Sequence, residues 1–253
     1  MTNFLWLARD RREILQLALA GGALGAFSAT PFAALAQTMA GEKMKIATIG
    51  AGREGGALGT LFAKAGHPVM FSSRKPEELK DLVASAGPMA RAGTVAEAVE
   101  FGDVVFLVVP YAAIEQIGKD HGKALAGKQL VIDVSNPIAR RDGDDLVKSV
   151  EQQGGAGLVT AKLIPGVHLV RAFNAINFAA LAKDANRAGD PVGIPIAGDD
   201  QKAIELASRL IKEIGFEPVL VGGLDKGKYL VPGTPLGGEH TPAEIREIAG
   251  KLA

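Results

Sequence analysis

The feature that most constrains this chain is a glycine-rich run directly after a short apolar segment. Residues 44–49 form the apolar segment, and Gly50, Gly52 and Gly55 follow it with the spacing G-x-G-x-x-G, before a helical pattern that continues to about Ala65. In this order the three glycines permit a tight turn, a close approach of the backbone to a phosphate, and close packing of helix on strand. The N-terminus of that helix also favours anions. The sequence therefore predicts an α/β, Rossmann-type dinucleotide-binding fold with a doubly wound, mostly parallel sheet.

The end of the second predicted strand, residues 69–71, indicates which dinucleotide is bound. It is followed by Ser72, Ser73, Arg74 and Lys75, where an NAD-binding domain usually presents Asp or Glu to the ribose hydroxyls. A carboxylate would repel a 2′-phosphate, whereas a hydroxyl and a guanidinium can bind it. We therefore expect NADP(H) rather than NAD(H), with Ser73, Arg74 and Lys75 near the 2′-phosphate.

Further alternation of apolar runs and helical patterns extends this fold. The predicted strands cover residues 103–110, 129–134, 168–173, 191–197 and 216–221, and the predicted helices include residues 94–101, 111–117 and 200–214. In such sheets ligands bind beyond the carboxyl ends of the strands. Val109, Pro110 and Asn136 should therefore lie beside the nicotinamide end of the cofactor. Asn136 could bond the carboxamide or only hold its own turn.

The N-terminal 36 residues are typical of an export signal rather than of the fold. Arg11 and Arg12 precede an uncharged Ala- and Gly-rich stretch, and Ala34-Leu35-Ala36 provides an A-x-A cleavage site. A twin arginine in this position indicates the Tat pathway, which would deliver a folded protein to the periplasm. We expect cleavage near Ala36 and a mature NADP-binding domain of residues 37–253 with a short C-terminal extension. The alternative is that the stretch anchors the chain in the membrane.

Composition excludes several other classes of function. The chain has no cysteine, so disulfides, thiolate metal sites and cysteine nucleophiles are excluded. The 28 basic and 28 acidic residues balance, so we expect no nucleic-acid partner. The four histidines do not have zinc-ligand spacing, so no metal is expected. A homodimer is compatible with the apolar, glycine-rich helices but does not follow from them.

Taken together, the motifs resemble the deazaflavin (coenzyme F420)-dependent NADP reductase family. The resemblance rests on the glycine run, Ser73-Arg74, Val109-Pro110, Ser135-Asn136-Pro137, residues 172–174 and residues 196–200. It implies hydride transfer between NADP(H) and a small, flat acceptor, such as a flavin or deazaflavin, stacked on the nicotinamide. It also implies contacts to cofactor or acceptor from these positions: Gly52, Arg53, Glu54, Ser73, Arg74, Val109, Pro110, Asn136 and Ala175. No catalytic residue is predicted, because such hydride transfer depends on positioning more than on an acid or base.

Two alternatives stay open at this point. One is an NADP-binding module without catalysis, such as a redox sensor or assembly factor. The other is an imine or keto-acid reductase, which would need a proton donor near the nicotinamide. The candidates for that donor are Tyr111, Lys162 and His168.

Overall fold

The computed structural model describes residues 42–252, and Lys43–Ala253 forms one compact unit. The predicted export signal, residues 1–36, lies outside the described residues. Within residues 42–252 no helix has the length and apolar character needed to cross a bilayer.

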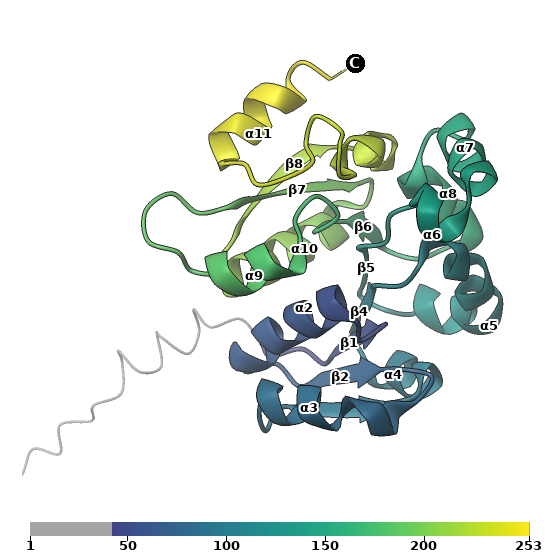
Figure 1. Ribbon diagram of the computed structural model, residues 1–253, viewed down its shortest axis with the longest axis vertical. Coiled ribbons are helices and arrows are strands. Elements are labelled where there is room, and N and C mark those ends of the chain that lie inside the picture. Colours follow the sequence, from purple (N-terminus) through teal and green to yellow (C-terminus); the bar gives the residue numbers. More distant parts are fainter. Residues whose placement is uncertain (1–41, 253) are drawn as a thin grey trace, which may run out of the picture. The chain divides into compact units, whose positions relative to one another are not determined.

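An eight-stranded sheet forms the centre of the unit (Figure 1). Its spatial order is β3-β2-β1-β4-β5-β6-β7-β8, and all neighbouring pairs are parallel except β6 with β7. The first six strands thus have the order 3-2-1-4-5-6, which confirms the predicted doubly wound Rossmann fold. The strands are β1 (Ile46–Ile49), β2 (Val69–Ser72), β3 (Ala90–Gly93), β4 (Val104–Leu107), β5 (Leu130–Asp133), β6 (Leu169–Arg171), β7 (Gly193–Gly198) and β8 (Glu217–Gly222).

The central strands are buried on both faces, which is why their sequences are continuous apolar runs. Every residue of β1, β4 and β5 is buried. Their side chains divide between two apolar clusters, one on each face of the sheet. Alternate residues therefore face opposite helix layers, as a parallel sheet with helices on both faces requires.

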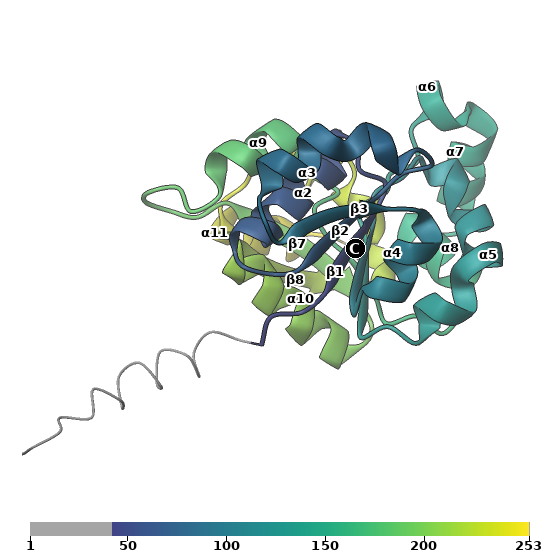
Figure 2. The same ribbon diagram turned by 90° about the horizontal axis from the view of Figure 1, so that it is seen from below.

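The two helix layers separate clearly in Figures 1 and 2. Helices α2, α9 and α10 supply one apolar cluster, and α4, α5 and α8 supply most of the other. The helices are α2 (Arg53–Lys64), α3 (Lys80–Ala86), α4 (Val95–Phe101), α5 (Ile114–Ala126), α6 (Ala139–Asp142), α7 (Asp144–Gln152), α8 (Ala156–Leu163), α9 (Phe178–Asp184), α10 (Gln201–Glu213) and α11 (Pro242–Ala249), with 3-10 turns η1 (Pro76–Leu79), η2 (Tyr111–Ala113) and η3 (Leu224–Leu230).

The C-terminal part extends the sheet beyond the nucleotide-binding order. Strands β7 and β8 pair in parallel, and α11 covers them through a third small cluster that includes Leu230, Leu236 and Ile245. Helix α11 begins with a capping box between Thr241 and Glu244. The backbone N–H of Gly238 donates to the carbonyl of Ala175, which ties this part to the loop after β6.

Three local features differ from the predicted elements or are absent from them. Ala90–Gly93, which lies outside the predicted strands, forms edge strand β3, because its backbone pairs with β2. The helix predicted to end at Ile117 continues to Ala126. The charged run at residues 140–145, for which no element was predicted, forms α6 and the start of α7. The buried Asp142 carboxylate accepts hydrogen bonds from the backbone N–H groups of Ile138 and Ala112.

Candidate functional site

The turn between β1 and α2 has the shape of a phosphate cradle. Gly50 has a φ of 98°, and a Cβ there would overlap the carbonyl oxygen of Val108. A Cβ at Gly55 would overlap the carbonyl of Gly50, whereas a Cβ at Gly52 would meet nothing within 4 Å. Two of the glycines are therefore needed for backbone packing, and the third leaves open space in front of the helix N-terminus. This arrangement fits the pyrophosphate of a dinucleotide.

A cleft of about 800 Å³ opens on one side of this turn. It lies between the ends of β1, β2 and β4 and the first part of α5, which is the switch point of the sheet. Its lining includes Gly50, Gly52, Ser73, Arg74, Val109, Pro110 and, from α5, Gln116, Asp120 and His121. None of these three α5 residues was predicted at the site, and Asp120 and His121 lie beyond residue 117, where the predicted helix ended.

Arg74 is exposed and lines this cleft. Among residues 42–252 it makes no hydrogen bond or ion pair, so its guanidinium is available to an anion. Lys75 differs, since its Nζ lies 2.9 Å from Glu78 Oε1 and it does not line the cleft. Ser73 Oγ accepts a hydrogen bond from the Lys75 backbone at 3.1 Å, while its hydroxyl proton has no acceptor among the described groups. Ser73 and Arg74 thus line the cleft, whereas Lys75 does not, and their contact with a 2′-phosphate stays a prediction.

A second, smaller cleft of about 290 Å³ lies on the other side of the glycine turn. Gly52, Val108, Val109 and Pro110 line both clefts, so the two meet at the turn. The smaller cleft is also lined by Arg53, Glu54, Asn136, Arg141, Phe173, Asn174, Ile176, Asn177 and Pro232. A dinucleotide with its pyrophosphate at Gly52 would reach both, with the nicotinamide end in the smaller cleft.

Asn136 is held by both its amide atoms. Its Nδ2 donates to the carbonyl of Asn174 at 2.8 Å, and its Oδ1 accepts from Arg171 at 3.1 Å. The side chain therefore bridges the loops after β5 and β6, rather than only holding its own turn. The second proton of this amide group has no acceptor among the described residues.

A buried ion pair that was not predicted from the sequence lies next to Asn136. Arg171 Nη1 lies 2.6 Å from Asp133 Oδ2, and both side chains are fully buried. Thr160 Oγ1 donates to the same carboxylate oxygen at 2.9 Å. A charged residue inside each of two apolar strands was the available signal, because charges in such positions must pair.

Glu54 lies in the first turn of α2 and faces the smaller cleft. Burial raises the pKa of its carboxyl to about 7, partly opposed by a hydrogen bond from the backbone N–H of Phe178. The Oε1 atom is buried and has no hydrogen-bond partner among the described residues. The sequence placed Glu54 at this site but gave no indication of its environment.

The three proton donors considered for a reductase of imines or keto acids are all misplaced. His168 directly precedes β6 and pairs with Asp200. Because β6 runs parallel to β5, His168 lies at the amino ends of these strands, whereas the clefts lie at their carboxyl ends. Lys162 is exposed on α8. The hydroxyl of Tyr111 is buried against Ala156 and Thr160, and burial raises its pKa to about 12. None of these side chains lines the smaller cleft.

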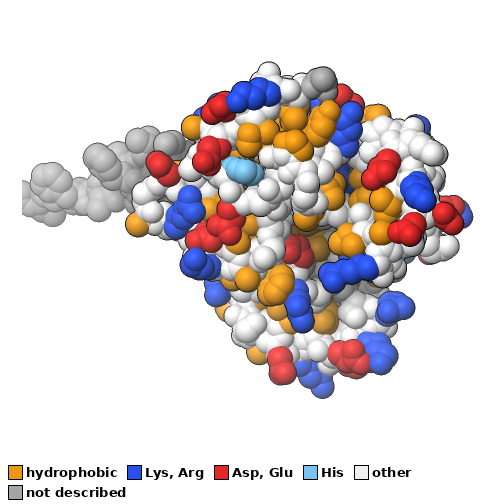
Figure 3. All heavy atoms as spheres, turned by 45° about the horizontal axis from the view of Figure 1, so that its top comes forward, with side chains coloured by type: hydrophobic (Ala, Val, Ile, Leu, Met, Phe, Trp, Pro, Cys, Tyr) orange, Lys and Arg blue, Asp and Glu red, His pale blue; other side chains and the backbone are white. Residues whose placement is uncertain are grey.

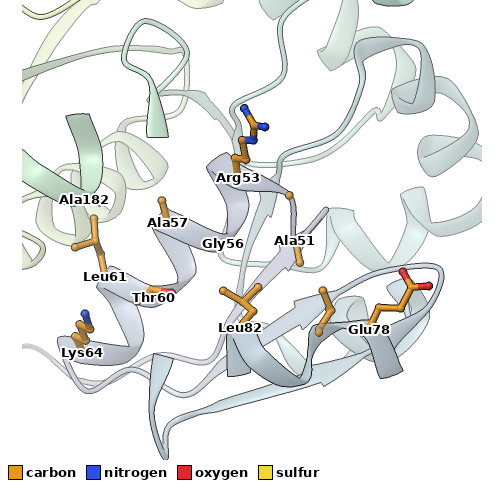
Figure 4. A pocket seen from close by; sticks show the side chains of 12 residues that line it. Ala51, Arg53, Gly56, Ala57, Thr60, Leu61, Lys64, Glu78, Leu82 and Ala182 are labelled. Carbon is orange, nitrogen blue, oxygen red and sulfur yellow. The ribbon is translucent and has the colours of Figure 1, made fainter. Parts of the chain in front are cut away.

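Two further features lie beside the clefts. Ala175 is buried in the loop after β6 and does not line the smaller cleft, although its neighbours Asn174 and Ile176 do. A groove of about 530 Å³ runs along α2 and meets both clefts at Gly52. Figure 4 shows Ala57, Leu61 and Leu82 on its apolar walls and Arg53 and Lys64 along its length. Figure 3 shows basic and acidic side chains interspersed over the face that it displays.

The comparison with protein families matches residues 45–137 to the family described as NADP oxidoreductase, coenzyme F420-dependent. These residues run from β1 to just past Asn136, so they contain the glycine turn, Arg74 and the Val109-Pro110 segment. The match confirms the predicted resemblance over this part of the chain. With the fold, it supports an NADP-dependent oxidoreductase.

Solved structures agree with the fold over most of the chain. A hypothetical protein from Sinorhizobium meliloti is 27% identical, with a TM-score of 0.66, and the match covers 81% of this chain and 98% of that one. A protein from Arthrobacter sp. FB24, provisionally assigned as an F420-dependent NADP-reductase, is 21% identical with a TM-score of 0.64 over 73% of this chain and 87% of that one. An imine reductase from Myxococcus stipitatus in complex with NADP+ is 18% identical with a TM-score of 0.53, over 73% of this chain and 57% of that one.

Proposed function

We propose that this chain, whose residues 45–137 match the coenzyme F420-dependent NADP oxidoreductase family, transfers hydride between NADP(H) and a small acceptor of the flavin or deazaflavin type. The observation that carries the proposal is the pair of clefts that meet at Gly52. The larger one presents Ser73 and Arg74 directly after β2, and the nearby carboxylate that also lines it, Glu78, is paired with Lys75. The smaller one offers room beside the expected nicotinamide position.

Different residues around the turn would bind different parts of NADP(H). Gly52 and the N-terminus of α2 would hold the pyrophosphate, and Arg74 with Ser73 would hold the 2′-phosphate. Val109 and Pro110 would form the wall shared by the two clefts. Bound NADPH would supply the hydride from its nicotinamide ring. The protein would then contribute orientation and partial exclusion of water.

Replacing Arg74 by Ala tests the choice of cofactor. If the guanidinium binds the 2′-phosphate, the variant should bind NADPH more weakly by about 1.5–3 kcal/mol, as expected for a hydrogen bond to a charged group. Binding of NADH should barely change. Arg140→Ala, which removes an exposed arginine of α6 outside both clefts, is the matched control. Equal losses for both nucleotides would contradict this role of Arg74.

We also propose that residues 1–36 direct export through the Tat pathway to the periplasm and are removed near Ala36. The support is the sequence pattern of twin arginine, apolar stretch and A-x-A site. Export of a folded domain is consistent with cofactor loading before transport. Replacing Arg11 and Arg12 by Lys should retain the full-length chain in the cytoplasm. Export that continues unchanged would reject the Tat assignment.

A further inference from the structure

Glu54 has a geometry that the binding of NADP(H) does not explain. The carboxyl of Glu54 lies near the backbone N–H of Phe178, the first residue of α9, and this contact partly offsets the rise in its pKa. Asn177 Oδ1 accepts from the next two N–H groups, those of Ala179 and Ala180. Glu54 thus lies where α2 and α9 pack together. Its Oε1 atom is buried and has no hydrogen-bond partner among residues 42–252, and its side chain lines the smaller cleft.

The charged groups around Glu54 are engaged elsewhere. The guanidinium of Arg53 lies 5.5 Å from the centre of the Phe178 ring. On the α6 wall of the cleft, Arg141 donates to Asp142 at 2.9 Å and to the carbonyl of Asn136 at 2.6 Å. Lys183 is exposed towards the far end of α9, and the adjacent Asp184 is buried there. No described cation forms an ion pair with Glu54, so burial dominates and the carboxyl exchanges its proton near neutral pH.

We infer that Glu54 is the proton donor of the reaction, and that the acceptor is one reduced across a C=N system that takes up a proton together with the hydride. This inference rests on the proposed function, since it places the acceptor in the smaller cleft. It also supplies the donor for which Tyr111, Lys162 and His168 were candidates from the sequence. A carboxylic acid in an apolar site suits this role, because its neutral form can donate at pH 7.

The proposed step balances in atoms and electrons. The acceptor gains hydride, with two electrons, at one end of its unsaturated system, and the nicotinamide is oxidised. A nitrogen at the other end of that system gains the proton that leaves the Glu54 carboxyl, so the carboxyl O–H bond breaks and an N–H bond forms. The Glu54 carboxylate then recovers a proton from water. The reverse reaction would use the same carboxylate as the base.

The first arm of the test follows the proton on the purified chain without nucleotide. The infrared band of a protonated carboxylic acid should titrate near pH 7 in the wild type and be lost in Glu54→Gln. Glu115→Gln is the matched control, because Glu115 also lies in the first turn of a helix but is exposed and paired with Lys119. The band should persist in that variant. A band that survives in Glu54→Gln overturns the inference.

The second arm measures NADPH oxidation with FMN and with 1-pyrroline as probe acceptors. In Glu54→Gln, kcat should fall by on the order of 10²-fold, the effect of removing a general acid. The fall of kcat above about pH 7 in the wild type should disappear in the variant. An unchanged kcat and pH profile would overturn the inference, as would NADPH binding by the wild type without turnover of either probe.

Calorimetry with NADPH separates the two proposals. Binding should be similar in the wild type, Glu54→Gln and Glu115→Gln, because the inferred role of Glu54 is toward the acceptor. If the wild type does not bind NADPH, the proposed function fails and the inference fails with it. If all three bind equally but proton transfer is unaffected by Glu54→Gln, only the inference fails.

Discussion

At the scale of single residues, the charged side chains of the site differ in burial and in ion pairing. Among residues 42–252 Arg74 has no hydrogen-bond or ion-pair partner and lines a cleft, whereas Arg171 is fully buried, pairs with Asp133 and donates to Asn136. The same type of side chain is thus available to bind an anion at Arg74 and stabilises the fold at Arg171. Glu54 is the third case, since it is buried without an ion-pair partner among residues 42–252.

Arg171→Met should reveal the cost of breaking the buried pair. The substitution leaves the Asp133 carboxylate charged and uncompensated inside the sheet, so the free energy of unfolding should fall by about 3–5 kcal/mol. Urea unfolding at pH 7 measures this loss. Lys251→Ala, which breaks an exposed pair with Glu247, should cause no measurable change. A similar, small effect of both substitutions would contradict the structural role of Arg171.

The residues of the site differ in how far the sequence could predict them. Gly50, Gly52, Gly55, Ser73 and Arg74 stand at fixed distances from the first two strands, so local pattern was sufficient to place them. Asp133 and Arg171 are far apart in sequence and meet only because β5 and β6 are neighbours. The unusual environment of Glu54 depends on α9, which packs against α2 from more than a hundred residues away. Contacts of that kind are set by tertiary packing, which a local motif does not encode.

At the scale of elements, the turn between β1 and α2 combines a structural requirement with a functional one. A Cβ at Gly55 would overlap the carbonyl of Gly50, whereas Gly52 has space and a φ of −73° that alanine can adopt. The same chemical change at two positions three residues apart should therefore have different effects. This contrast separates folding from binding within a single turn.

Gly55→Ala should lower the free energy of unfolding by about 1–3 kcal/mol, because the backbone must shift to admit the methyl group. Gly52→Ala should cost less than about 1 kcal/mol of stability. Its methyl group would stand where the pyrophosphate approaches, so NADPH binding should weaken at least about tenfold, or about 1.4 kcal/mol. Thermal unfolding and calorimetry on both variants check the pair. Full NADPH affinity in Gly52→Ala would argue against a phosphate site at this turn.

Strands were predicted correctly from the sequence where their apolar runs were long. They were not predicted where they form only because a neighbouring strand pairs with them. Strands β1, β4 and β5 are buried on both faces, and their continuous apolar runs were recognisable. Strand β3 has the sequence Ala-Arg-Ala-Gly, which has little strand propensity, and it forms because β2 offers an unpaired edge. Likewise, the local sequence does not indicate that β7 pairs antiparallel with β6.

At the scale of the whole unit, one cluster joins its first described residues to the opposite half of the sheet. Glu213 of α10 lies 3.0 Å from Lys43 and 2.8 Å from the buried His67. Burial opposes ionisation of Glu213, but the hydrogen bonds and charges of Lys43 and His67 together lower its pKa. The cluster thus connects the residues before β1, the residues after α2 and the end of α10.

This cluster should make stability depend on pH in the acid range. Because the folded pKa of Glu213 lies below the unfolded value, its contribution is present above about pH 4.5 and is lost as pH falls through the folded pKa. The melting temperature of wild type should therefore decline more steeply below pH 4.5 than that of Glu213→Gln. Scans at pH 3 to 6 measure the difference. Parallel curves for the two proteins would show that Glu213 does not contribute in this way.

The most direct test of the account is calorimetric titration of the purified chain with NADPH and with NADH, after any nucleotide carried through purification has been removed. The account predicts that NADPH binds and that NADH binds more weakly, by about the 1.5–3 kcal/mol assigned to Arg74. Arg74→Ala should reduce that difference. Binding of neither nucleotide would mean that the glycine turn serves the fold alone, and the proposed oxidoreductase function would be contradicted.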